Sequence, residues 1–139
     1  MERVLRSSGW FPGRQVDIQA WREGLAEFSW HVAAERFLAE FGGISVNVSG
    51  PGITVAREPF DVDPELAVGE EERFEELSDR FGRRFFPVGE FREGEFLLGI
   101  DEDGILYSLG AWAFSLGTSD KALGNLIEGV RGVRLNSRE

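Results

Sequence analysis

The chain has 139 residues and no cysteine, and 25 acidic residues against 15 lysines and arginines give it a formal net charge of -10. This length suits one domain with a buried core, and the missing cysteines exclude disulfides, thiolate nucleophiles and cysteine-ligated metal sites. So acidic a domain is repelled by nucleic acid and anionic lipid and attracted to basic proteins.

The N-terminal residues favour a short helix over Glu2–Ser8, which Gly9 and the turn-forming pair Pro12-Gly13 bring to an end. Its charged residues leave no apolar core of the kind that signal peptides carry. No apolar run in the sequence approaches the ~18 residues that a membrane span needs. We therefore expect a cytoplasmic protein that forms a single domain over residues 1–139.

Two longer helices are predicted next. Asp17 can act as an N-cap. Apolar residues three and four apart then mark one helical face: Ile18, Trp21, Leu25 and Phe28. A second helix is expected over Ser29–Phe41, with Gly42-Gly43 as its C-terminal stop. The only histidine, His31, adjoins a tryptophan, and we interpret it as a partly buried packing residue rather than a catalytic base.

Apolar and polar residues alternate over Ile44–Val48, which is typical of a half-buried strand. The turn Ser49-Gly50-Pro51-Gly52 then leads into Ile53–Arg57, which we interpret as the returning strand. Beyond it, Pro64–Ala67 is expected to form a short turn, followed by a helix from about Gly69 to Phe81.

Three short strands are predicted in the C-terminal half: Arg84–Phe91, Glu95–Asp101 and Ile105–Leu109. Pro87 in the first of them indicates an edge strand or a bulge, and Gly99 and Gly110 indicate bulges or close packing. A last helix is expected to begin near Thr118–Asp120. This order of elements indicates an α+β fold, with a mostly antiparallel sheet of about five to six strands and helices packed on one face.

The stretch DVDPELAVGEEERFEELSD, residues 61–79, concentrates the negative charge, with nine carboxylates against one arginine. Phe74, Leu77 and Phe81 form one inward stripe of the predicted helix. The acidic side chains then lie on the outward arc: Glu70, Glu71, Glu72, Glu75, Glu76 and Asp79. Each carboxylate in the first turn is stabilised by roughly 0.3–1 kcal/mol through attraction to the positive helix N-terminus. Like-charge pairs four residues apart offset this, because each pair is destabilising by about 0.2–0.5 kcal/mol. Helix stability therefore does not explain the charge, and both a solvated face and a docking surface for a basic partner stay open.

Calcium binding is a second interpretation of this stretch. Four acidic residues share the spacing of calcium-loop ligands: Asp61, Asp63, Glu65 and Glu72. Leu66 stands where the sharp turn needs glycine, and Pro64 precedes it, so we expect no metal there. The cluster Asp101-Glu102-Asp103-Gly104 also looks like a cation site. Its Asp-Gly pair between two apolar runs instead predicts a hairpin tip, with a secondary contact role for Asp101, Glu102 and Asp103.

Motifs for catalysis are missing from the sequence, which has no nucleophile elbow, P-loop or dinucleotide-binding fingerprint. A glycosidase would need one carboxylate set among aromatic residues, and Glu40 beside Phe41 and Glu90 beside Phe91 are the best candidates. Tryptophans can anchor protein interfaces. Trp112 follows a predicted strand and alternates with small residues, so we keep it as a contact candidate.

Four segments together form a distinctive series: GWFPGRQVDIQAW, AAERFLAEFGGISV, GPGITVAREPFDVDPELAVGEEERFEELSDRFGRRFFPVGEF and FLLGIDEDGILY. In this order they resemble the SUKH superfamily, in its third subgroup, over roughly Gly9 to Ala113. Members are immunity proteins of bacterial polymorphic toxin systems. The resemblance implies an α+β domain that binds a toxin effector domain, commonly a nuclease, and blocks it without catalysis or a cofactor. It carries over no catalytic residues.

Our principal hypothesis is a non-catalytic, cytoplasmic immunity protein that neutralises a basic nuclease domain through an acidic surface. We expect no cofactor, metal, nucleic-acid or membrane partner. The expected contacts are Glu70, Glu71, Glu72, Glu75, Glu76, Asp79, Asp101, Glu102, Asp103 and Trp112. One alternative is an intracellular regulatory or scaffolding domain with a non-toxin partner. Another is a carboxylate enzyme, which needs a cleft with two carboxylates ~5–9.5 Å apart.

Overall fold

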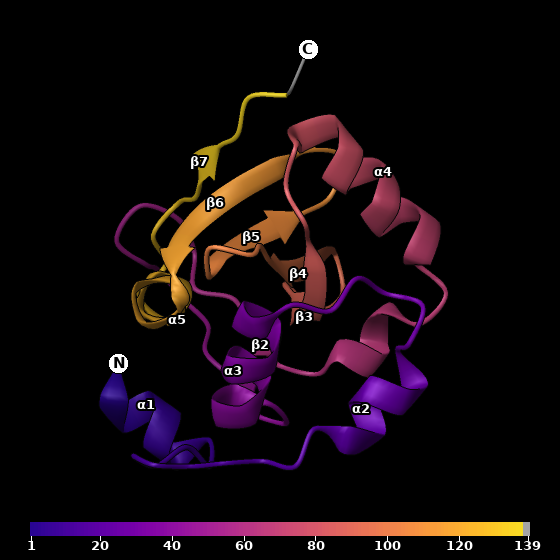
Figure 1. Cartoon of the computed structure of the whole chain (residues 1–139). Coiled ribbons are helices and arrows are strands. Elements are labelled where there is room, and N and C mark those ends of the chain that lie inside the picture. The colour runs from indigo at the N-terminus through magenta and orange to yellow at the C-terminus, as the bar shows by residue number, and fades with distance from the viewer. Residues whose placement is uncertain (138–139) are drawn as a thin grey trace.

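The computed structural model of the chain describes residues 1–137. Within them the elements run α1 (Glu2–Ser7), α2 (Gln19–Gly24), α3 (Val32–Phe41), β1 (Ser45–Val46), β2 (Phe60–Asp61), η1 (Pro64–Ala67, a 3-10 helix), α4 (Glu71–Phe81), β3 (Phe86–Phe91), β4 (Phe96–Ile100), β5 (Ile105–Leu109), β6 (Ala113–Thr118), α5 (Ser119–Glu128) and β7 (Val133–Arg134). Figure 1 shows them in chain order, from α1 near the N-terminus to β7 near the C-terminus.

All strand pairs are antiparallel, and the strands follow one another across the sheet in chain order, from β1 at one edge to β7 at the other. The predicted α+β class is therefore confirmed. Within residues 1–137 the sheet has seven strands rather than five or six, because β6 and β7 extend it beyond the predicted strand over Ile105–Leu109. Pro87 begins a bulge in β3, as predicted, although β3 lies inside the sheet between β2 and β4.

Helices flank both faces of the sheet rather than one. Ser108 of β5 pairs with Phe114 of β6, and together with Leu126 of α5 they line a cavity on one face. Gly99 of β4 pairs with the residue before Ser108 and so belongs to the opposite face. There Phe74 of α4 lies 3.4 Å from where a Cβ on Gly99 would be. β5 is buried along most of its length on both sides, which is why one helical layer does not suffice. Figure 1 shows α4 and α5 on opposite sides of the central strands.

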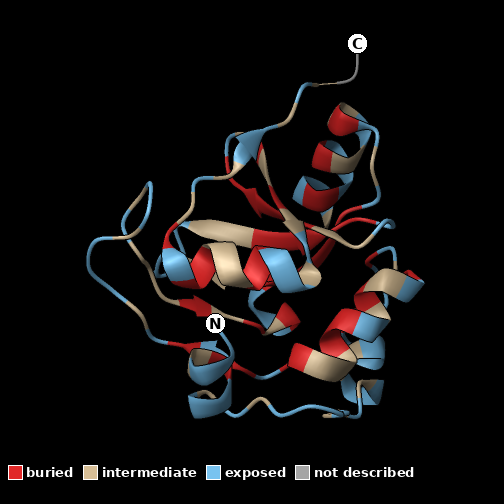
Figure 2. Ribbon diagram, turned by 90° about the vertical axis from the view of Figure 1, so that its left-hand side faces the viewer, coloured by how far each residue is buried: buried red, intermediate tan, exposed pale blue. Residues whose placement is uncertain are grey.

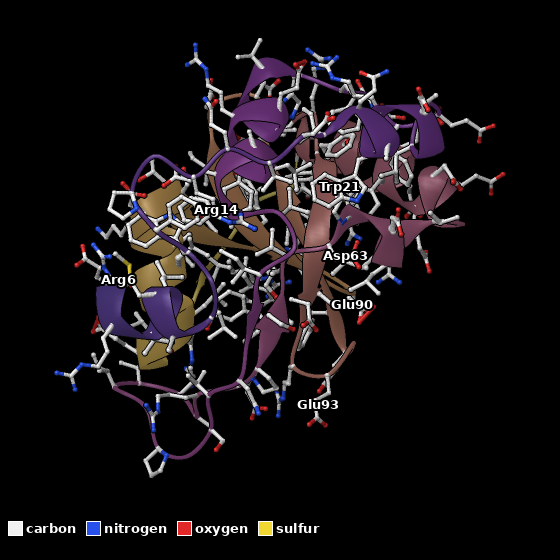
Figure 3. The ribbon with its side chains drawn as sticks, turned by 90° about the horizontal axis from the view of Figure 1, so that it is seen from below. Arg6, Arg14, Trp21, Asp63, Glu90 and Glu93 are labelled. Atoms are coloured by element: carbon white, nitrogen blue, oxygen red, sulfur yellow. The ribbon has the colours of Figure 1, made fainter. Side chains whose placement is uncertain are left out.

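The N-terminal segment fastens onto the end of α3 through two side chains. Trp10 Nε1 donates to Glu40 Oε2 at 3.0 Å. The Arg14 guanidinium donates to the carbonyls of Glu40, at 2.6 Å, and Gly42, at 2.8 Å. These are carbonyls at the end of a helix, which have no partner within it. Trp21 packs so closely on Gly42 that an added Cβ would lie 2.5 Å from the indole. Figure 3 labels Arg14 and Trp21 among the side chains. The segments GWFPGR (residues 9–14) and FLAEFGG (residues 37–43) are therefore packed and hydrogen-bonded together, and we call this contact the Trp10–Arg14 joint.

His31 begins α3 rather than lying inside it. Its Nδ1 accepts from the backbone N–H of Ala34 at 3.1 Å, which makes it the N-cap and starts the helix at Val32. Nε2 then carries the proton and faces the carbonyl oxygens of Arg84, at 2.9 Å, and Ile100, at 3.2 Å. The predicted packing role is confirmed, and the ring also ties α3 to the sheet.

The predicted returning strand Ile53–Arg57 is wrong. Its backbone donors go to the C-terminal end of α5 instead: Ile53 N–H to Glu128 O, and Thr54 and Val55 N–H to Gly129 O. Those carbonyls need partners at the helix end, and the segment supplies them. β1 therefore pairs with Phe60–Asp61, further along the chain. Figure 2 shows the buried residues concentrated in the sheet and on the helix faces turned toward it.

Candidate partner-binding surface

Helix α4 and its N-cap residue carry six of the ten predicted contact residues, and the helix has the predicted amphipathic form. Phe74, Leu77 and Phe81 are buried against the sheet, and Gly82 closes the helix in the left-handed conformation at φ 67°. Four predicted contacts are exposed on its outward side: Glu72, Glu75, Glu76 and Asp79. Within residues 1–137, no ion pair involves an acidic side chain of this helix. The helix therefore presents an unneutralised anionic face.

The two carboxylates at the start of α4 are less exposed than the others. Glu70 stands at the N-cap position without a capping hydrogen bond from its side chain. Glu71 turns back, and its Oε1 accepts from the backbone N–H of Gly69 at 3.2 Å. Both lie where the positive end of the helix favours negative charge. They are half-buried members of the same anionic face.

A hollow of about 290 Å³ separates α4 from the segment that joins α2 to α3. Its lining contains four carboxylates and one guanidinium, from Glu27, Glu71, Glu75, Asp79 and Arg84. Three aromatic rings line it as well: Phe28, Phe74 and Phe85. All three rings are almost fully buried. The hollow thus joins an acidic rim to an apolar, aromatic base.

Arg84 connects this hollow with the β4–β5 hairpin tip. Its Nη2 donates to Ser29 Oγ at 3.2 Å and to the Trp30 carbonyl at 3.0 Å. Its backbone N–H donates to Glu102 Oε1 at 3.1 Å. Burial works against ionisation of Glu102, but this backbone donor, the backbone N–H of Glu102 itself and the nearby positive charge of Arg84 leave the Glu102 pKa below its usual value. Glu102 therefore stays anionic beside Arg84.

The predicted hairpin tip is confirmed, but its three acidic residues differ in exposure. Glu102 and Asp103 are exposed, whereas Asp101 is 0% exposed. Asp101 Oδ1 accepts from the backbone N–H groups of Asp103, at 2.9 Å, and Ile105, at 3.1 Å. Its Oδ2 accepts from the Tyr107 hydroxyl at 2.6 Å and lies 3.5 Å from Arg83 Nη1. Asp101 therefore organises the turn from inside and is withdrawn from any contact surface.

Trp112 lies beyond the C-terminal end of α4, away from the carboxylates of its first turns. The indole is half-buried, packs edge-on against Phe81 at 5.4 Å and donates from Nε1 to Leu135 O at 2.6 Å. The guanidinium carbons of Arg80 and Arg134 lie 4.1 and 4.3 Å from its ring centroid. Trp112 is thus surrounded by cations and fastens the C-terminal strand to the sheet.

Sequence reasoning missed three residues of this surface. Leu66 and Val68 are 42% and 60% exposed, and they lie directly before the acidic helix. Their signal was two large apolar residues within an otherwise acidic stretch. Glu27 comes from the α2–α3 segment and reaches the hollow from the side opposite α4. No spacing in the sequence links Glu27 to α4, because the two meet only in the folded chain, where Phe28 packs on Phe74.

Two further findings concern the part of the chain that the structure describes. No group of three or more histidine or acidic side chains there is placed to hold a metal ion. No helix there is long and apolar enough to cross a membrane.

Comparison with known proteins places the chain in a family. No curated protein and no solved structure gives a significant match. The family model described as SUKH-3 immunity protein matches residues 1–129, which include the Trp10–Arg14 joint, the acidic helix and the hairpin tip. The chain therefore belongs to the SUKH-3 immunity protein family.

Proposed function

We propose that this protein is a non-catalytic immunity protein that binds a basic toxin effector domain, a nuclease, in the cytoplasm and blocks it. Membership of the SUKH-3 immunity protein family is the observation that supports this most strongly. The anionic face of α4, together with Glu102 at the hairpin tip, is the surface we assign to the toxin. Two of the earlier candidates have other tasks, since Asp101 is buried and Trp112 fastens the C-terminal strand.

Electrostatics supports a nuclease as the target. A nuclease must attract a polyanion and therefore carries a basic surface around its active site. The exposed carboxylates of α4 have no cationic partner within residues 1–137, so they are free to meet that surface. Complementary charge raises association rates toward 10⁸–10⁹ M⁻¹s⁻¹ at low salt. Fast capture lets the immunity protein compete with nucleic acid for the toxin.

The proposal needs no catalytic group in this chain. Glu40, a candidate acid of the enzyme hypothesis, instead accepts from Trp10 Nε1 and supports the N-terminal joint. Inhibition by occupation requires only a stable interface of suitable charge and shape.

Association kinetics test the assigned surface. We expect a variant in which Glu71, Glu72, Glu75 and Glu76 are all changed to Gln to bind the toxin domain encoded beside its gene at least tenfold more slowly at low salt. The salt dependence of the rate should also become shallower, because fewer charges take part in steering.

A matched control removes the same number of charges from exposed positions elsewhere: Glu23→Gln, Glu93→Gln, Asp120→Asn and Glu128→Gln. The control should change the rate by less than threefold. If the α4 variant has an unchanged association rate and salt dependence, this helix does not take part in binding. If both variants slow association equally, only the net charge of the protein matters and not the position of the charges on α4.

A further inference from the structure

We infer that the hollow between α4 and the α2–α3 segment is the anchor point of the interface and receives an arginine side chain of the partner. This inference rests on the proposed function and deepens it, because it names the group that is recognised. The bound group is a guanidinium carried on an apolar stem.

The charge of the lining selects a cation. Glu27, Glu71, Glu75 and Asp79 face the same space as the single cation Arg84, so the lining carries three net negative charges. Arg84 offsets one of the four carboxylates, and its Nη2 is held by Ser29 Oγ and the Trp30 carbonyl rather than by a carboxylate of the rim.

The aromatic base adds a second, independent reason for a binding role. An acidic helix that only faces solvent would need no cavity beside it. Here a cavity is present beside α4, and Phe28, Phe74 and Phe85 line it. Phe28 and Phe74 meet edge to face at 5.6 Å, which fixes the shape of the base. Apolar walls lower the local dielectric and strengthen any ion pair that forms at the rim.

Arginine fits this combination better than lysine. The planar guanidinium carries five donors, enough to engage carboxylates contributed by two different elements. It also packs its flat face and methylene stem against apolar and aromatic groups, whereas the ammonium group of lysine is compact and strongly hydrated.

An exposed apolar ledge next to the hollow supplies further contact area. Leu66 and Val68 project from the turn before α4, and Gly69, which follows them, is joined to Glu71 by a hydrogen bond. Glu71 also lines the hollow, so this hydrogen bond links the segment that carries the ledge to the rim of the hollow. Apolar contacts rimmed by charge are the usual composition of a protein interface. The partner segment therefore carries an arginine with an apolar residue close beside it.

Two pairs of substitutions on the same helix isolate the hollow from the overall charge of α4. The test pair, Glu75→Gln with Asp79→Asn, removes two carboxylates that line it. The control pair, Glu72→Gln with Glu76→Gln, removes two carboxylates that do not. All four residues are exposed and spaced by four, so each pair has the same net charge and a similar effect on helix stability.

The probe is a hexa-arginine peptide, titrated by calorimetry at physiological salt. We expect the test pair to weaken binding about tenfold or more, because charged hydrogen bonds in a sheltered site are lost, and the control pair to weaken it less than threefold. Equal losses in the two pairs, a larger loss in the control pair, or no measurable binding by the unsubstituted protein would overturn the inference.

The peptide titration and the toxin-binding experiment can fail separately. If the toxin domain binds but the peptide distinguishes neither pair, the hollow is not the anchor and the proposed function stands. If the peptide result holds but the toxin domain does not bind, the site recognises arginine and the proposed function is wrong.

Discussion

At the scale of single residues, the hairpin tip shows what decides whether an acidic side chain is available for contact. Asp101, Glu102 and Asp103 are adjacent and chemically alike, yet only Asp101 is buried. Its partners Arg83 and Tyr107 lie outside the turn. The hairpin could be predicted from Asp-Gly between two apolar runs. The burial of the Asp101 side chain could not be predicted from the sequence, because it depends on contacts with Arg83 and Tyr107 that form only in the folded chain.

Replacing Asp101 with alanine should lower the free energy of unfolding by about 2–4 kcal/mol. The change leaves two backbone donors, a buried hydroxyl and one guanidinium without their acceptor. Urea denaturation measures the difference. The control Asp103→Ala, at the exposed neighbour, should stay within about 0.5 kcal/mol. A similar small effect at Asp101 would show that the carboxylate does not organise the turn.

Tyr107 makes stability sensitive to alkaline pH. Burial, the hydrogen bond to Asp101 and the negative charge of Asp101 all raise the Tyr107 pKa above its usual value. The folded state then holds the phenolic proton more tightly than the unfolded state, whose tyrosine pKa is about 10. The stabilisation that comes from the raised Tyr107 pKa is fully present below about pH 10. It is lost as pH rises further, by up to about 1.4 kcal/mol per pH unit.

The variant Tyr107→Phe should lack this alkaline loss and show a flatter dependence of unfolding free energy on pH above about 10. Since Tyr107 is the only tyrosine in the sequence, tyrosinate absorbance reports its ionisation directly. Identical pH dependence in the two proteins, or ionisation at the usual tyrosine pKa, would contradict the buried hydrogen bond.

At the scale of elements, local pattern predicted α4 and the strands β3 to β5 well, because each has a clear periodicity or turn signal. It failed for Ile53–Arg57, whose backbone donors are used at the end of α5 rather than in a strand ladder. Strands β6 and β7 were also missed. The prediction placed Trp112 after the last strand, Ile105–Leu109, whereas β6 extends the sheet from Ala113 and pairs with β7. The first error concerns partners that are distant in the chain, at the end of α5, whereas β6 pairs with the strand directly before it, β5.

A substitution at Gly89 tests how closely β2 packs beside β3. A Cβ at this position would overlap the carbonyl of Asp61, and it would also press on Val62. Gly89→Ala should therefore lower the free energy of unfolding by about 2–3 kcal/mol, as overpacking against backbone does. The contrasting variant Gly24→Ala, at the end of α2, meets nothing within 4 Å and should be neutral or slightly stabilising. Thermal or urea unfolding of both proteins compares them, and equal stabilities would contradict the close approach.

At the scale of the whole molecule, the distribution of charge matters more than its total. The net charge of -10 predicted a basic partner, and the stretch 61–79 predicted where the charge lies. The structure adds that α4 borders a hollow with an aromatic base and that Glu102 joins the same region through Arg84. The region at the C-terminal end of α4 has the opposite charge, because Arg80 and Arg134 lie around Trp112. We expect such a division of charge to orient a basic partner as well as to attract it.

Protection of living cells is the most direct test of the proposed immunity function. The experiment needs a toxin domain encoded in the neighbourhood of the gene. That domain is expressed with the unsubstituted protein, with the test pair Glu75→Gln and Asp79→Asn, or alone, and growth is measured. We predict that the unsubstituted protein restores growth and co-purifies with the toxin domain, and that the test pair restores growth less well. Growth arrest that the unsubstituted protein does not relieve, with no complex recovered, would contradict the assignment as an immunity protein.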